Sequence, residues 1–380
     1  VDTRADVTVS VDVGHDLASL KYSGSLSFSS DAKYQGVNPH VKGKIDFDNT
    51  QVSYGIDVTL DQEAVRLAGA VKQYMKTPDI ELNVTSKSLN IDNLLAMAAG
   101  LGGGLAKHPE PSRKTSVPSS NGEKKAVQSI GSQLPAGLKA HGQVRIDEAM
   151  YKNLPVRDFQ LDYLLENNIL TVSRFITKTA GGEIRKNVEM DLNQVDLAYK
   201  GTVEVKAIQM DQLQAGLFPK IPERLYGALS THLTFSGAGI KWPALADKLN
   251  MSGDYSLSDG QLQNVDIAKT IAQAVGLNEL KDIQFNDFSG NMQILEGKLR
   301  LKYQMDGQDV DIASERGTIS LDGTAVSLPF RLTFSPMVSE KLQQRSSLVS
   351  YLSDEKGQTT LQLKVTGSVR KPLVTLDSSG

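Results

Sequence analysis

Apolar and polar residues alternate along most of this chain, and no other feature constrains its fold as strongly. The clearest run has an apolar residue at every second position: Val52, Tyr54, Ile56, Val58 and Leu60. Residues 298–305 alternate in the same way. Successive side chains of a β-strand point to opposite faces, so each run predicts a strand with one buried face. The sequence therefore predicts a mainly β protein of antiparallel strands.

A few short helices are expected between these strands. Apolar residues recur there at helical spacing, or a proline stands where the first helical turn accepts it. The expected helices are a short one capped by Asn90 or Asp92 that runs through Leu95, residues 210–217, 243–249 and 265–275, and a stretch that starts at Ser335-Pro336.

One hairpin is also expected near the C-terminus. Asp322-Gly323 is a typical hairpin turn, and residues 319–321 and 330–334 on either side of it carry bulky apolar residues on one face. The pattern predicts that these two segments pair, without fixing their register.

Composition divides the chain into three parts. Lys, Pro, Ser, Gly and Asn dominate residues 107–125, which cannot bury enough apolar surface to offset the entropy lost on ordering. We expect residues 101–133 to be a flexible linker or a long loop. This segment separates an N-terminal β-rich region, residues 1–100, from a C-terminal β-rich region, residues 134–380.

A strand that leads into a short helix recurs along the sequence. Residues 83–94 parallel residues 204–213, and residues 263–267 begin in the same way. Repetition of such a unit favours elongated growth over a single closed globule.

Charge and chemistry exclude several classes of function. The 41 Lys and Arg nearly balance the 44 Asp and Glu, whereas a nucleic-acid-binding protein usually has a basic excess. There is no cysteine, and the five histidines are scattered. Phosphate-loop and nucleophile-elbow motifs are absent. We therefore expect no catalytic residues, no metal, no cofactor, no nucleic-acid partner and no enzymatic activity.

No stretch of the sequence is long and apolar enough to span a bilayer. The longest apolar run, residues 94–106, is interrupted by glycines and is shorter than the ~20 residues a spanning helix needs. The sequence starts directly in the strand-like residues 7–13, so we expect no signal peptide within it.

Residues 251–306 contain short signals in a distinctive order. Gly253 lies in a strand, an Asp259-Gly260 turn follows, and a helix opens with Val265-Asp266-Ile267. Two strands come next, with the patterns Phe288-x-Gly290 and Gly297-x-Leu299. This order resembles the C-terminal region of the AsmA-like family of bacterial envelope proteins, relatives of TamB. The resemblance continues through residues 317–321 and 367–372; it covers most of 134–380 and, more weakly, 1–100.

The resemblance implies a shape, a compartment and a ligand. AsmA-like and TamB-like proteins are related to bridge-type lipid carriers with apolar interiors, which implies an elongated, curved antiparallel sheet that forms a groove or trough. It implies a periplasmic protein that is anchored to the inner membrane in full length, of which this chain is the soluble part without the anchor. The expected ligand is a phospholipid or another acyl-chain lipid, and inner- or outer-membrane proteins are candidate partners.

The candidate groove residues lie on alternating strands near the C-terminus. They are Leu299, Leu301, Tyr303, Ile319, Leu321, Phe330, Leu332, Phe334, Leu361, Leu363 and Val365. Periodicity alone does not distinguish an apolar groove from the filled interior of a sandwich or barrel. With the resemblance, we predict a non-enzymatic envelope protein of phospholipid transport or outer-membrane biogenesis. The alternatives are an envelope scaffold with a filled β core and, less favoured, a secreted enzyme on a β scaffold.

Overall fold

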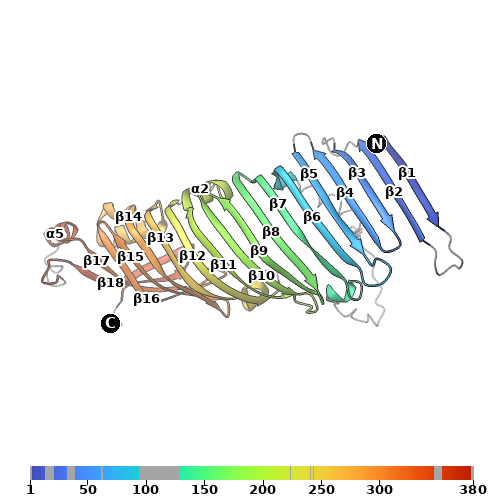
Figure 1. Cartoon of the computed structure of the whole chain (residues 1–380). Helices are drawn as coiled ribbons and strands as arrows, with labels where there is room; N and C mark the ends of the chain where they lie inside the picture. Colours follow the sequence, from blue (N-terminus) through green and yellow to red (C-terminus); the bar gives the residue numbers. More distant parts are fainter. Residues whose placement is uncertain are drawn as a thin grey trace, which may run out of the picture. The chain divides into compact units, whose positions relative to one another are not determined.

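The structure, a computed structural model, consists mainly of β-strands joined into one hydrogen-bonded sheet of nineteen strands (Figure 1). It describes residues 2–12, 21–31, 39–60, 63–93, 129–222, 224–239, 241–242, 244–345 and 353–377. The predicted linker, residues 101–133, lies outside the described residues except for its last five positions. The mainly β fold predicted from the alternation is confirmed.

The first strands are β1 (Asp2–Asp12), β2 (Lys21–Asp31), β3 (Pro39–Asp48), β4 (Gln51–Leu60), β5 (Glu63–Lys72), β6 (Asp79–Asn90) and β7 (Lys139–Tyr151). Then come β8 (Leu154–Glu166), β9 (Ile169–Thr179), β10 (Gly182–Asp191), β11 (Ala198–Gln209), β12 (Arg224–Ala238) and β13 (Asn250–Gln263). The last are β14 (Ile283–Leu295), β15 (Lys298–Gly307), β16 (Val310–Ser320), β17 (Val326–Phe334), β18 (Thr360–Ser368) and β19 (Lys371–Leu376).

Short helices lie between some of these strands, where helical spacing or a starting proline predicted them. The α-helices are α2 (Met210–Leu217), α3 (Ala244–Lys248), α4 (Asp266–Val275) and α5 (Pro336–Arg345). Two 3₁₀ turns, η2 (Gly131–Gln133) and η3 (Asn278–Lys281), are also described, and residues 91–93 after β6 are helical.

Consecutive strands pair with one another, and nearly all pairs are antiparallel. Of the strand pairs with a described register, β6–β7 departs from the predicted antiparallel sheet: it is parallel, with Val84 beside Val144. Parallel neighbours need a long crossover, and the connection between β6 and β7, residues 91–138, supplies that length.

Contacts divide the chain into two compact units. Unit 1 comprises residues 1–155, 164–169 and 192–195, and unit 2 comprises residues 156–163, 170–191 and 196–380. Unit 1 therefore holds β1–β7, whereas unit 2 holds β10–β19 with α2 to α5.

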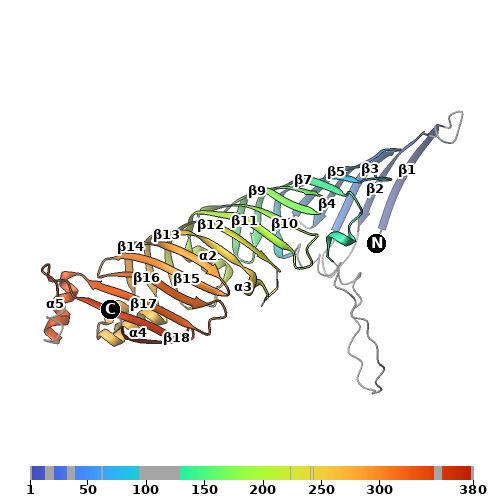
Figure 2. The same cartoon turned by 90° about the horizontal axis from the view of Figure 1, so that it is seen from below.

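The C-terminal part of unit 2 is a packed core on one side of its sheet. Helix α4 lies over this side (Figure 2), where Ala268 and Ala272 are each 2% exposed. Gly276 ends α4 in the left-handed conformation (φ 71°), and its N–H bonds back to Ala272 and Gln273. The chain can thus turn directly into η3, whose Leu280 is also buried.

The predicted hairpin forms between β16 and β17. Ile319 pairs with Val326, and Gly323 occupies the turn with a φ of 72°. Phe334 pairs with Val310 at the far end of the hairpin. Residues 319–320 and 330–334 thus belong to adjacent strands but do not lie directly opposite each other, and Leu321 lies in the turn.

Candidate functional site

Unit 2 aligns its apolar residues into rows that cross the sheet from strand to strand. Directly opposed residues of an antiparallel ladder share a face, so the register places three adjacent rows on one side, here called the apolar face. The middle row is Lys186, Val203, Leu233, Gly253, Met292, Leu301 and Gly317. One flanking row is Val188, Gly201, Phe235, Met251, Ile294, Leu299 and Ile319. The other is Ile184, Val205, Thr231, Tyr255, Gly290, Tyr303 and Ser314.

Much of this face is only half-buried. Val203, Leu233, Met292 and Leu301 all keep intermediate exposure in the middle row. The residues between them on each strand point to the opposite face and are mostly polar. The rows thus provide an extended apolar surface that the described elements cover incompletely.

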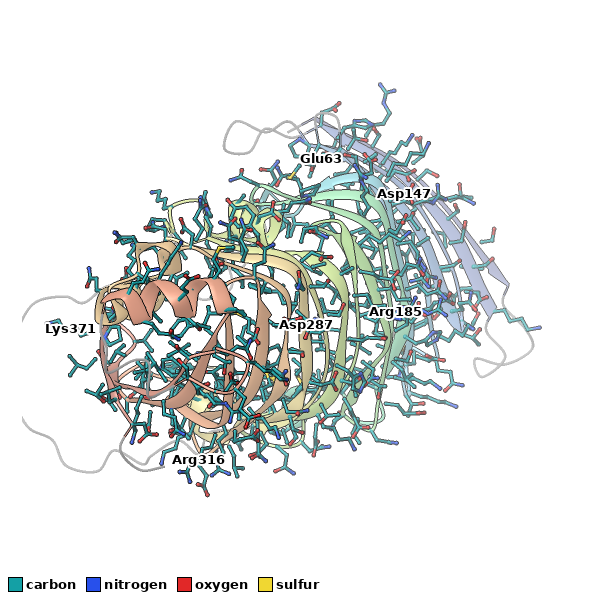
Figure 3. The ribbon with its side chains drawn as sticks, turned by 90° about the vertical axis from the view of Figure 1, so that its left-hand side faces the viewer. Glu63, Asp147, Arg185, Asp287, Arg316 and Lys371 are labelled. Atoms are coloured by element: carbon teal, nitrogen blue, oxygen red, sulfur yellow. The ribbon has the colours of Figure 1, made fainter. Side chains whose placement is uncertain are left out.

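The C-terminal end of the apolar face, in contrast, is filled. Strands of unit 2 curve there (Figure 3), and α4, η3 and α5 pack against them. Phe334 is fully buried, Leu332 is 1% exposed, and Val338 and Leu342 of α5 join the same cluster.

The predicted groove residues divide between these two environments. Phe330, Leu332, Phe334, Leu363 and Val365 are buried in the filled cluster. Leu301, Tyr303, Ile319 and Leu361 are partly buried against it. Leu299 and Leu321 have intermediate exposure and lie outside the cluster. Nine of the eleven candidates therefore meet in or beside one apolar cluster, and their assignment to a lipid groove stays a prediction.

A cluster of aromatic rings lies where the filled part of the apolar face meets the half-buried part. The ring of Phe288 meets those of Tyr255, Phe285 and Tyr303 edge-on, with centroids 5.6, 6.0 and 5.8 Å away. Burial raises the pKa of Tyr255 and of Tyr303 to about 12. Both hydroxyls are thus neutral at physiological pH.

Unit 1 has an apolar face of its own. One row is Val7, Leu26, Ile45, Tyr54, Gly69 and Leu82, and the next is Ala5, Phe28, Gly43, Ile56, Leu67, Val84 and Val144. Every residue of β4 before Leu60 is half-buried, and Val7 is 64% exposed. The sequence analysis placed no site residue here, although the alternation of residues 52–60 signalled such a face.

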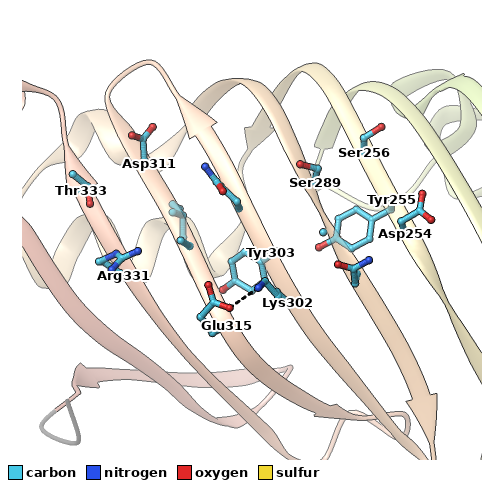
Figure 4. A pocket seen from close by; sticks show the side chains of 15 residues that line it. Asp254, Tyr255, Ser256, Ser289, Lys302, Tyr303, Asp311, Glu315, Arg331 and Thr333 are labelled. Atoms are coloured by element: carbon cyan, nitrogen blue, oxygen red, sulfur yellow. Dashed lines mark ion pairs between the residues drawn. The ribbon is translucent and has the colours of Figure 1, made fainter.

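A depression of about 660 Å³ opens on unit 2 (Figure 4), and Tyr255 and Tyr303 of the apolar rows lie beside its mainly polar lining. Its lining includes Asp254, Arg331 and the ion pair between Lys302 Nζ and Glu315 Oε2, which are 2.7 Å apart. Lys302 stands between Leu301 and Tyr303 on β15, so it points away from the apolar face. The charged lining does not suit acyl chains.

Within the described part of the chain, no group of three or more His, Asp or Glu side chains could hold a metal ion. None of the described helices is long and apolar enough to cross a membrane.

Comparison with known proteins supports the resemblance seen in the sequence. Neither the curated proteins nor the solved structures give a match to this chain. The model of the AsmA family matches residues 38–303, from the start of β3 into β15. This range includes residues 251–303 and much of unit 1, and it ends before the motifs at 317–321 and 367–372. With a match over more than half of its length, the chain belongs to the AsmA family.

Proposed function

We propose that this protein binds acyl-chain lipid along its apolar sheet faces and acts in phospholipid transport or outer-membrane biogenesis. The observation that carries the proposal is the half-buried apolar face formed by aligned rows in each unit. Membership of the AsmA family, whose proteins are associated with the bacterial envelope, supports the same function.

Physical chemistry explains how such a face would work without a catalytic motif. Transferring one buried CH₂ group into water costs about 0.8 kcal/mol, so a 16-carbon chain costs roughly 13 kcal/mol. An apolar surface removes most of this barrier for a lipid that crosses an aqueous space. The headgroup can remain in solvent, and no bond is made or broken.

Membership of the family supports the proposed setting. We place the protein in the periplasm, with the full-length form anchored to the inner membrane. Its further partners would be proteins of the inner or outer membrane. The proposed role is non-enzymatic.

The filled end of unit 2 favours a second candidate. Helices α4 and α5 bury one end of the apolar face as an ordinary core is buried. If the half-buried rows are covered in the same way in the cell, the protein would be an envelope scaffold with no lipid path.

Three charge insertions test the lipid-binding proposal. Leu301→Asp places a carboxylate on the half-buried part of the face, where it keeps access to water. We expect lipid recovered by extraction from the purified protein to fall severalfold, with little change in Tm. Leu332→Asp buries an unpaired charge in the filled cluster and should destabilise the fold by several kcal/mol.

Gln304→Asp is the matched control. It introduces the same charge on the same strand, but on the opposite face, so bound lipid and Tm should both stay unchanged. An unmutated protein that carries no lipid, or a Leu301→Asp variant that unfolds as Leu332→Asp does, would favour the scaffold.

A further inference from the structure

One charged side chain interrupts the apolar rows of unit 2. The register pairs Lys186 of β10 with Val203 of β11, and the row continues through Leu233. Across β10–β15, every other residue in the three rows is apolar, a glycine or a hydroxyl-bearing residue. A lysine within such rows needs a physical explanation because its ammonium group is costly to remove from water.

Lys186 has no anionic partner among the described residues. Its Nζ lies 4.2 Å from the ring centroid of Phe175, which in turn contacts Phe159 edge-on at 5.2 Å. Among the described residues no carboxylate forms an ion pair with it, although lysines on the opposite face have such partners. Lys200, for example, lies 2.9 Å from Glu189.

Within the described part of the chain, the ring of Phe175 is therefore the group that holds the cation. Burial lowers the pKa of Lys186, since nothing nearby offsets the desolvation of its charge. The side chain is nevertheless half-buried, so the ammonium group is accessible to a ligand that lies on the face. A bound anion would supply the missing partner.

We propose that Lys186 binds the negatively charged headgroup of an acyl-chain lipid whose tails lie along the apolar rows. The proposal rests on the proposed lipid-binding function and adds the class of lipid: one with a net negative headgroup, through either a phosphodiester or a carboxylate. Charge complementarity favours this class, because a zwitterionic headgroup brings its own cation close to the ammonium group. A charge-assisted hydrogen bond from Lys186 to the headgroup would select the lipid.

Lipid loading from vesicles tests this. The lipid-stripped protein is incubated with vesicles made of equal amounts of phosphatidylcholine and phosphatidylglycerol. In a separate experiment the vesicles contain equal amounts of phosphatidylcholine and oleate. The protein is then re-isolated, and its bound lipids are quantified. We expect the anionic lipid to be enriched roughly three- to tenfold over its share in the vesicle. Enrichment of phosphatidylglycerol alone would identify a phosphate, and enrichment of oleate alone a carboxylate; both outcomes support the proposal.

Three variants assign the enrichment to the side chain. Lys186→Met keeps the apolar stem and should load lipid at the vesicle ratio, whereas Lys186→Arg should keep the enrichment. Lys200→Met removes the same charge from the opposite face and should behave as the unmutated protein.

Three other outcomes separate this inference from the function on which it rests. Equal loading of phosphatidylcholine and anionic lipid by the unmutated protein, or unchanged enrichment in Lys186→Met, would overturn the role of Lys186 and leave lipid binding intact. Failure to load any lipid would overturn lipid binding itself.

Discussion

Glycines within the rows of the apolar face allow neighbouring strands to approach closely. Gly290 lies between Tyr255 and Tyr303 on the apolar face, and a Cβ atom there would overlap the backbone carbonyl of Lys302. We expect Gly290→Ala to shift β14 from β15 and to lower the free energy of unfolding by about 1–3 kcal/mol. Urea unfolding measures this. Gly55→Ala, where the nearest atom is 3.8 Å away at the flexible end of Arg66, is the control and should change stability far less.

A second residue-scale prediction concerns acid stability at the β16–β17 turn. Hydrogen bonds from Ser320 and from the N–H and hydroxyl of Thr324 lower the pKa of Asp322 to about 2. An unfolded aspartate titrates near 3.9, so the stabilisation is complete above about pH 4 and is lost as pH falls through 2. Asp322→Asn does not titrate. The Tm difference between the two proteins should therefore shrink between about pH 4 and pH 2, and a constant difference would contradict this origin.

At the scale of elements, α5 closes one end of the apolar face. Its Val338 and Leu342 are 3% and 5% exposed, and the hydroxyl of Ser339 accepts the N–H of Thr359 at 2.8 Å. Leu342→Ala should leave a cavity under the helix and cost about 2–4 kcal/mol in urea unfolding. Glu340→Ala, on the exposed side of α5, should leave stability nearly unchanged. Equal effects of the two substitutions would mean that α5 is not docked.

The sequence predicted individual strands and turns better than it predicted any other level of the structure. Alternation along residues 52–60 and 298–305 predicted strands, and Asp322-Gly323 predicted a hairpin, because these signals depend only on neighbouring residues. Which strands have their apolar face covered by helices was not predictable from neighbouring residues. Leu301 and Leu332 sit in equivalent alternating patterns, yet Leu301 is half-buried, whereas Leu332 is buried in the cluster that α4, η3 and α5 complete.

The parallel pair β6–β7 was missed for a related reason. Strand direction depends on where a long connection returns, and residues 91–138 carry no periodic signal that fixes this. Lys186 was missed because a single lysine in an alternating strand looks like an ordinary polar position until the register shows its neighbours.

At the scale of the whole molecule, the two units differ in how far their apolar faces are covered. Unit 2 buries β17 almost completely on that face, whereas the residues of β2 to β4 in unit 1 are mostly half-buried. Local opening is easier where few apolar groups are buried, and backbone amides exchange faster there. In the lipid-stripped protein we expect amide hydrogen exchange in β2–β4 to be faster than in β17.

Lipid should change this contrast, because a bound acyl chain supplies the missing cover. Loading should slow exchange in β2–β4 and in the half-buried rows of β11–β13, and leave β17 unchanged. Hydrogen exchange followed by mass spectrometry, with and without phosphatidylglycerol vesicles, measures the exchange of all these strands in the same protein. The Leu301→Asp variant provides the control: if lipid lies on the apolar face, its protection of β11–β13 should weaken. Uniform protection of every strand on loading, β17 included, would instead indicate general stabilisation of the fold and would argue against lipid on the half-buried rows.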